Sequence, residues 1–176
     1  MTQTATAPAL SPDEAARVER IARDFRSPLK MRAYFSAKLP LALFAGLRVR
    51  ELSTARCAVD VPYGWRTTNP FRSTYFAAQC MAAELSTGAL VMLAVQSSRD
   101  PVSMLVANMT ASFEKKASQT LTFTCENGAD AFAAVRETLR TGEGVTVPMR
   151  TVGRLPDGTV AATFEFIWTM KKKTAR

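Results

Sequence analysis

The chain has 176 residues, of which 47% are hydrophobic and 22% are charged, values that suit one globular domain with a full core. It contains no histidine, which excludes serine–histidine–aspartate and cysteine–histidine catalysis and any metal site built on imidazole. The net charge of +8 suits an anionic partner. No zinc-finger, RRM-like or helix-turn-helix pattern is present, so nucleic acid is not expected, and an anionic membrane or a phosphorylated small molecule stays open.

Residues 1–10 are rich in threonine, alanine and proline and are predicted to be disordered. No positively charged segment followed by an apolar run opens the chain, so a signal peptide is not expected and the predicted location is the cytoplasm. The apolar stretch at residues 88–95 is too short to span a bilayer. We expect one domain over residues 11–172, followed by a solvated basic tail at 173–176.

Proline and serine mark the first helices. Ser11, Pro12 and Glu14 form a capping-box sequence that starts an amphipathic helix, and Pro28 ends it. A second helical segment follows and is interrupted by Pro40, after which a short apolar run closes at Gly46. Alternating residues at 47–51 and 57–61, separated by a turn near 53–54, then predict a β-hairpin.

A long apolar helix is predicted after the turn at Asn69-Pro70. Ser73 or Thr74 is the expected N-cap, and residues 76–85 leave almost no polar face, which is typical of a buried helix. Glu84 is the one charge in this stretch, and a buried carboxylate is costly unless it is paired or functional. The helix is expected to continue toward Met92, with a loop over residues 97–101.

The remainder predicts further strands. Period-2 alternation covers residues 105–113, 121–125, 145–149 and 160–170, with a short helix at 132–139 that Gly142 stops and a hairpin turn at 155–159. The predicted fold is therefore α+β, a curved antiparallel β-sheet wrapped around a central buried α-helix, with extra N-terminal helices. The three cysteines have no paired spacing and are expected to be small buried hydrophobic residues, not disulfides.

The segment from Asn69 to Gly88, with its Asn-Pro-Phe, Tyr-Phe-Ala-Ala and Ala-Ala-Glu-Leu runs, resembles the hotdog-fold thioesterase superfamily. The resemblance covers about residues 41–172 and is strongest to a branch related to the phenylacetyl-CoA-type acyl-CoA thioesterases. In those relatives a loop asparagine precedes His-Gly-Gly, and an aspartate follows on the central helix. Asn69 matches the asparagine and Glu84 the helix carboxylate, whereas Tyr75-Phe76-Ala77 stands in place of His-Gly-Gly.

The resemblance implies thioester hydrolysis, with Glu84 as general base or nucleophile and Asn69 orienting water or the carbonyl. The backbone amides of Ser73, Thr74 and Tyr75 at the helix start would bind the oxyanion. The alternatives are a structural ion pair for Glu84, a turn-forming role for Asn69 and, favoured for Tyr75, a core aromatic. Lys115 and Lys116 are candidate ligands for CoA phosphates, or simply a solvated strand end.

Two functions are therefore expected to compete. The first is an acyl-CoA thioesterase, and the second is a non-catalytic protein that binds acyl-CoA or a fatty acyl group. A dehydratase is disfavoured because that chemistry in the superfamily uses a histidine. The resemblance also implies a homodimer or a dimer of dimers, and neither a metal nor a cofactor is expected. The acyl chain and the choice between CoA and acyl carrier protein stay open.

Overall fold

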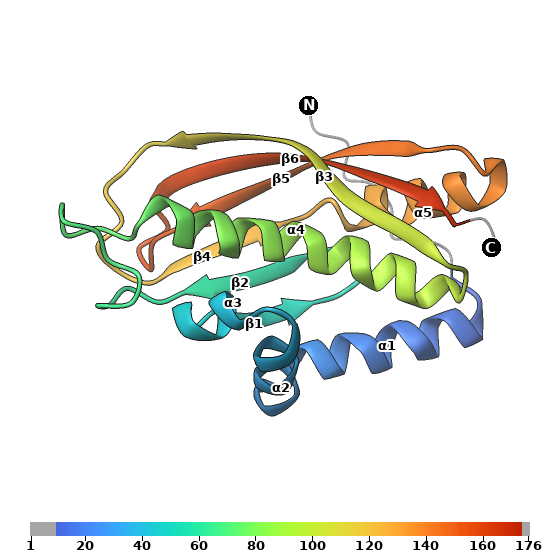
Figure 1. Ribbon diagram of the computed structural model, residues 1–176, viewed down its shortest axis with the longest axis horizontal. Helices are drawn as coiled ribbons and strands as arrows, with labels where there is room; N and C mark the ends of the chain where they lie inside the picture. Colours follow the sequence, from blue (N-terminus) through green and yellow to red (C-terminus); the bar gives the residue numbers. More distant parts are fainter. Residues whose placement is uncertain (1–9, 174–176) are drawn as a thin grey trace.

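The computed structural model describes residues 10–173 (Figure 1). The predicted tails, residues 1–10 and 173–176, lie almost wholly outside this range. Three helices open the fold: α1 (Pro12–Arg26), α2 (Pro28–Lys38) and α3 (Pro40–Ala45). The predicted capping box of α1 is present, since Ser11 Oγ accepts the Glu14 N–H and Glu14 accepts the Ser11 N–H, each at 3.3 Å. Gly46 ends α3 with a φ of 76°, a conformation that glycine adopts without strain.

One six-stranded antiparallel sheet follows, in the order β1-β2-β4-β5-β6-β3. Its edge strands are β1 and β3, at opposite sides of the sheet. The strands are β1 (Arg48–Leu52), β2 (Cys57–Val61), β3 (Val102–Phe113), β4 (Leu121–Cys125), β5 (Val145–Arg154) and β6 (Val160–Lys172). The long β3 and β6 pair from Val102 opposite Lys172 to Phe113 opposite Ala162, so β3 extends along the whole of β6.

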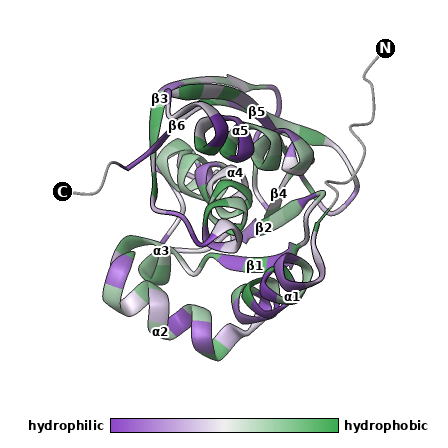
Figure 2. Ribbon diagram, turned by 90° about the vertical axis from the view of Figure 1, so that its right-hand side faces the viewer, coloured by the Kyte–Doolittle hydropathy of each residue, from purple (hydrophilic) through white to green (hydrophobic). Residues whose placement is uncertain are grey.

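The sheet curls around α4 (Phe76–Ser98), which Figure 2 shows nearly end-on. Small residues let the helix approach the strands closely: a Cβ at Gly88 would lie 3.0 Å from the Trp168 ring. Two buried hydrogen bonds join helix to sheet, from Trp168 Nε1 to Thr87 Oγ1 at 3.0 Å and from Ser86 Oγ to Thr151 Oγ1 at 2.8 Å. The predicted α+β architecture, a curved antiparallel sheet around a central helix, is confirmed.

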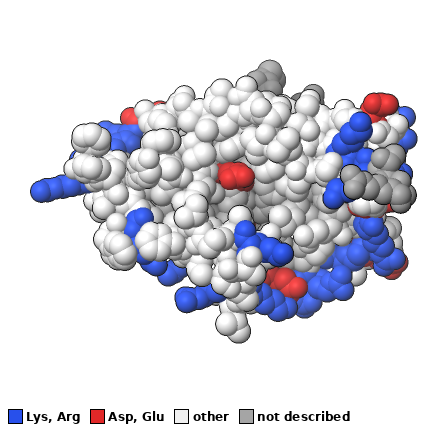
Figure 3. All heavy atoms as spheres, in the orientation of Figure 1, with Lys and Arg blue, Asp and Glu red and all other residues white. Residues whose placement is uncertain are grey.

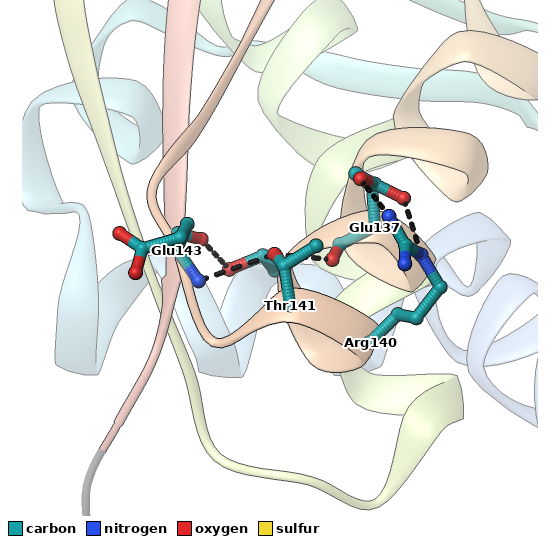
Figure 4. A network of polar contacts seen from close by, with 5 residues as sticks. Glu137, Arg140, Thr141 and Glu143 are labelled. Atoms are coloured by element: carbon teal, nitrogen blue, oxygen red, sulfur yellow. Dashed lines mark hydrogen bonds and ion pairs between the residues drawn. The ribbon is translucent and has the colours of Figure 1, made fainter.

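The helix α5 (Gly128–Thr141) lies between β4 and β5 in the chain and packs on α4. Its C-terminus is tied to the sheet, because the buried Thr138 Oγ1 donates to the Glu143 carbonyl at 2.5 Å and accepts the Lys172 N–H at 3.0 Å. Figure 4 shows the surrounding contacts, in which Thr141 accepts the Glu143 N–H and Arg140 pairs with Glu137. These bonds fix the turn that leads into β5.

Three local predictions about α4 were wrong. Residues 97–98 belong to the helix instead of a loop, because the hydroxyls of Ser97 and Ser98 donate to the carbonyls of Ala94 and Val95 three residues earlier. The N-cap is Tyr75, with no side-chain cap, instead of Ser73 or Thr74. The helix is also not buried all round, since Phe76 and Glu84 are exposed in the single chain.

Among the described residues, α4 is the one helix whose length and apolarity would match a membrane span. Most of its apolar window is buried inside the protein, which is the position of a core helix. The predicted burial of Cys57 and Cys125 is confirmed, and burial raises the pKa of Cys125 to about 12 and that of Cys57 further, so both stay protonated thiols. Cys80 is only half-buried.

We predict that Gly153→Ala destabilises the fold by about 1–3 kcal/mol, the usual range for overpacking a core. A Cβ at Gly153 would lie 2.6 Å from the ring of Phe123, and that ring is fully buried. Calorimetry should show a lower Tm, by about 2–4 °C per kcal/mol. The matched control is Gly144→Ala, because nothing lies within 4 Å of a Cβ there. Equal melting temperatures for the two variants would contradict the packing described.

Candidate active site at the start of the central helix

A cavity of about 650 Å³ lies where the loop before α4 meets the end of β3. It brings together residues far apart in the sequence, because Thr74 N–H donates to the Ala117 carbonyl at 2.7 Å and pins the loop beside β3. The cavity contains six of the seven predicted site residues: Asn69, Ser73, Thr74, Tyr75, Lys115 and Lys116. The seventh, Glu84, is not among its lining residues.

Asn69 shapes the loop that forms one wall. Its Oδ1 accepts the Phe71 N–H at 3.0 Å, the Ser73 N–H at 3.2 Å and the Ser73 hydroxyl at 3.1 Å. This is an Asx-turn, in which the side chain replaces a backbone acceptor. The side-chain oxygen Oδ1 of Asn69 therefore has the turn-forming role that was the alternative to a catalytic one. Only the Nδ2 group of this side chain is left to donate to a substrate or a water.

The amides expected to bind an oxyanion are already used. The Ser73 N–H donates to Asn69, the Thr74 N–H to the Ala117 carbonyl and the Tyr75 N–H to the Thr67 carbonyl at 2.7 Å. The prediction that these three groups are free donors is wrong. At the start of the helix, the N–H groups of Phe76 and Ala77 have no acceptor among the described residues. The next two N–H groups, those of Ala78 and Gln79, donate to the Tyr75 carbonyl.

Gln79 is a polar residue of the cavity that the sequence did not single out. It is 6% exposed, and its Nε2 donates to the Thr74 carbonyl at 3.0 Å. Its Oε1 is buried and has no hydrogen-bond partner in the part of the chain that the structure describes. Since buried acceptors are nearly always satisfied, this oxygen is suited to accept a hydrogen bond from a bound molecule. A glutamine inside an apolar helical run is the sequence signal that was available.

Aromatic side chains and charges line the opening of the cavity. Tyr75 is 47% exposed and meets Phe76 edge-on with ring centroids 4.9 Å apart, so the interpretation of Tyr75 as a core aromatic is wrong. Lys115 and Lys116 follow the end of β3 and are exposed. Glu114 is the one carboxylate among the lining residues, and its Oε1 accepts the Thr163 hydroxyl at 3.1 Å.

Glu84 lies further along α4, on the helix face that also carries Phe76 and Cys80. Its side chain is exposed in the single chain, which corrects the prediction that it is buried. The apolar side chains around it still remove water, and this desolvation raises the pKa of Glu84 above its ordinary value. Burial, and then the charge of Glu84, likewise raise the pKa of the Cys80 thiol. The Glu84 carboxylate has no hydrogen bond or ion pair among the described residues.

The surface around Glu84 is otherwise without charge. Figure 3, in the orientation of Figure 1, shows a single acidic group within a broad uncharged area over α4 and β3. Glu84 is the only charged residue in either element. Exposed apolar side chains of the same strand include Leu105, Met109 and Phe113, and β3 is an edge strand with one side unpaired. An uncharged edge of this length is normally covered by another chain or element.

Comparison with known proteins places the chain in a family. The sequence profile described as a domain of unknown function, DUF4442, matches residues 29–169, which is most of the chain. No protein of curated function matches the sequence.

Solved structures share the architecture. A Chlorobaculum tepidum protein of unknown function has a TM-score of 0.70 at 14% identity, covering 84% of this chain and 98% of that one. A Pseudomonas aeruginosa protein described as a probable thioesterase has a TM-score of 0.69 at 18% identity, covering 84% and 97%. A Haemophilus influenzae thioesterase has a TM-score of 0.62 at 9% identity, covering 83% and 91%. These likenesses confirm the predicted hotdog fold, and the chain belongs to the DUF4442 family.

Proposed function

We propose that the protein is a thioesterase that hydrolyses an acyl-CoA at a site shared between two copies of the chain. The proposal rests on the backbone amides of Phe76 and Ala77, which have no acceptor among the described residues. They begin α4, and Phe76 lines the cavity. Helix N-termini stabilise negative charge, and such donors are what the tetrahedral oxyanion of thioester hydrolysis requires.

The reaction needs a base as well as these donors. Water attacks the thioester carbonyl carbon while a carboxylate takes its proton, and the oxyanion collapses with release of the thiolate, which is then protonated. Glu84 is suited to this role, because its raised pKa makes it a better proton acceptor than an ordinary exposed carboxylate.

Helix geometry argues that the base comes from a second copy. Glu84 is eight residues beyond Phe76, which is about 12 Å along the helix axis. A general base must lie within hydrogen-bond reach of the attacking water, so Glu84 is too far along its own helix to serve a carbonyl held at the Phe76 amide. In a two-fold dimer the same surfaces meet twice, and Glu84 of each chain can face the cavity of the other.

The uncharged area on α4 and β3 supports such a dimer. The unpaired edge of β3 offers backbone hydrogen bonds to a second β3. Met109, Ala111 and Phe113, which share one face of the strand and are exposed, offer apolar area. Covering this area would also complete the desolvation of Glu84. A homodimer is the smallest assembly that does so, and a dimer of dimers contains the same contact.

The substrate class follows from the charge of the opening. Lys115 and Lys116 line the cavity without an ion-pair partner among the described residues, and lysines bind phosphates as point charges. Together with the aromatic pair Tyr75 and Phe76, they suit a CoA thioester whose phosphates stay at the surface while its acyl group enters the cavity.

A second candidate function is acyl-CoA binding without hydrolysis. It is favoured by the composition of the cavity itself, where Glu114 is the one carboxylate among the described lining residues and is already hydrogen-bonded to Thr163. In this case acyl-CoA should raise the Tm of the protein without being consumed. A panel of thioesters of increasing chain length, with detection of the free thiol, separates the two functions.

We predict that Glu84→Gln lowers kcat by about 10²–10⁴, the usual contribution of a general base. Glutamine keeps the size of the side chain but cannot accept the proton. The matched control is Glu114→Gln, which removes the carboxylate of the cavity itself and should leave kcat within a few-fold of the wild type. Full activity of Glu84→Gln, or an equal loss in both variants, would exclude Glu84 as the base.

We also predict a pH-dependent effect of Glu84→Gln on stability. A raised pKa in the folded chain means that the charged carboxylate opposes folding above that pKa and costs nothing below its unfolded value near 4.5. The Tm of Glu84→Gln should therefore exceed that of the wild type at pH 7.5, and the difference should vanish toward pH 4. Glu126→Gln, at an exposed position, serves as control. If the wild type instead has the higher Tm at pH 7.5, Glu84 takes part in a stabilising ion pair.

Sedimentation tests the proposed assembly. The wild type should be a stable dimer or larger at micromolar concentration, and Met109→Asp/Ala111→Asp should shift it to monomer, because these two exposed residues share one face of β3 and charges there would be buried without partners in the dimer. The control is Leu29→Asp on α2, where the leucine is 79% exposed and far along the chain from β3. A monomeric wild type would remove the shared site.

A further inference from the structure

A second and larger cavity, of about 830 Å³, lies at the opposite edge of the sheet, between the N-terminal helices and β1. Its size is within the range of small-molecule sites. Its apolar lining is continuous and comes from α1, α2, α3 and β1, and includes Phe25, Met31, Phe35, Leu43, Leu47 and Val49. None of the residues expected or found at the start of α4 belongs to this lining, so the cavity is a separate site.

The charged residues that line this cavity are all arginines. Five are present, and no aspartate or glutamate lines it. Arg26 is paired with Glu19 and Arg50 with Asp60. The other three, Arg32, Arg48 and Arg66, have no ion pair and no hydrogen bond among the described residues. Three unpaired guanidinium groups around one apolar cavity are unusual, because unpaired like charges repel one another.

These three arginines come from different elements. Arg32 lies on α2, Arg48 at the start of β1, and Arg66 in the loop after β2, where its guanidinium lies against Gly46 at the end of α3. The fold therefore gathers them at one place. A guanidinium presents a planar array of donors that binds a carboxylate or a phosphate with two parallel hydrogen bonds.

We propose that this cavity binds an amphiphile with one aliphatic chain and an anionic head, a carboxylate or a phosphate, the head held by Arg32, Arg48 and Arg66. The apolar lining buries the chain, which is favourable in proportion to the area removed from water. The anion neutralises the three arginines, which have no ion-pair partner among the described residues. The site is independent of the proposed hydrolysis and is tested without any measurement of turnover.

The first experiment is calorimetric titration of the full chain with dodecanoate, dodecyl phosphate and dodecanol, each below its micelle concentration. We expect saturable binding of one anionic amphiphile per chain, and binding of dodecanol at least about tenfold weaker, since charge-assisted hydrogen bonds are lost. The variant Arg32→Gln/Arg48→Gln/Arg66→Gln should bind dodecanoate at least about tenfold more weakly than the wild type does. The matched control removes the same charge elsewhere: Arg20→Gln/Arg23→Gln/Arg150→Gln.

The second measurement locates the ligand even if the triple variant does not fold. Trp65 is 79% exposed and packs edge-on against Phe44, a lining residue, with ring centroids 5.9 Å apart. The other tryptophan, Trp168, is buried against α4. A brominated dodecanoate should quench wild-type fluorescence, and Trp65→Phe should abolish the quenching.

Four results of these two experiments would overturn the proposal. In the titrations they are no saturable binding of either anionic amphiphile, dodecanol binding as tight as that of dodecanoate, and an equal loss of dodecanoate affinity in both triple variants. In the fluorescence measurement it is quenching that persists in Trp65→Phe. Binding to vesicles of anionic phospholipid without binding of the free amphiphiles would also overturn it, because the arginines and exposed apolar residues would then form a membrane-docking surface.

Discussion

The close packing of α4 against the concave face of the sheet is the constraint on which the rest of the structure depends. Gly88 lets the Trp168 ring lie against the helix backbone, and Trp168 is held there by its hydrogen bond to Thr87. The sheet, α1 and α5 together cover only part of the helix, so one face of α4 is left uncovered among the described residues. That face carries Glu84 and adjoins the unpaired edge of β3. The proposed site, its base and its dimer contact all follow from this incomplete covering.

The same packing determines which groups are available at the start of α4. The loop before the helix is held by the Asx-turn of Asn69 and by the bond from Thr74 to Ala117, so its own amides are satisfied. The helix that follows begins at Phe76 without a side-chain cap. Its first amides therefore have no acceptor within residues 10–173, and Phe76, the first residue of the helix, lines a cavity with two lysines at its opening. An arrangement of this kind is suited to bind a developing negative charge.

Most of the fold was predictable because its signals are local. The capping box at Ser11, the stop at Gly46 and the turn at Asp157-Gly158 depend on neighbouring residues, and the strands on alternation. The predictions about the site were less successful. The N-cap was misplaced because Ser73 and Thr74 are held by partners elsewhere, one of them Ala117, far along the chain.

The burial of Glu84 was mispredicted for a different reason. A helix that is apolar all round predicts burial all round, but one face of α4 has no cover among the described residues. Gln79 was missed because a single glutamine gives no pattern, and its unsatisfied oxygen is visible only in three dimensions. The cavity beneath α2 and α3 was missed because its three unpaired arginines, Arg32, Arg48 and Arg66, come from separate segments.

The shared site is the central claim, and subunit mixing tests it most directly. Phe76→Pro removes one oxyanion amide while keeping the helix start, because proline suits the first helical position and Tyr75 is extended with a ψ of 136°. Phe76→Ala, which keeps the amide, is its control. Phe76→Pro and Glu84→Gln, each inactive alone, are mixed in equal amounts and allowed to exchange subunits. If the base and the amides of one site come from different chains, each mixed dimer has one intact site, and about a quarter of wild-type activity should return. No recovery after proven exchange would contradict the account.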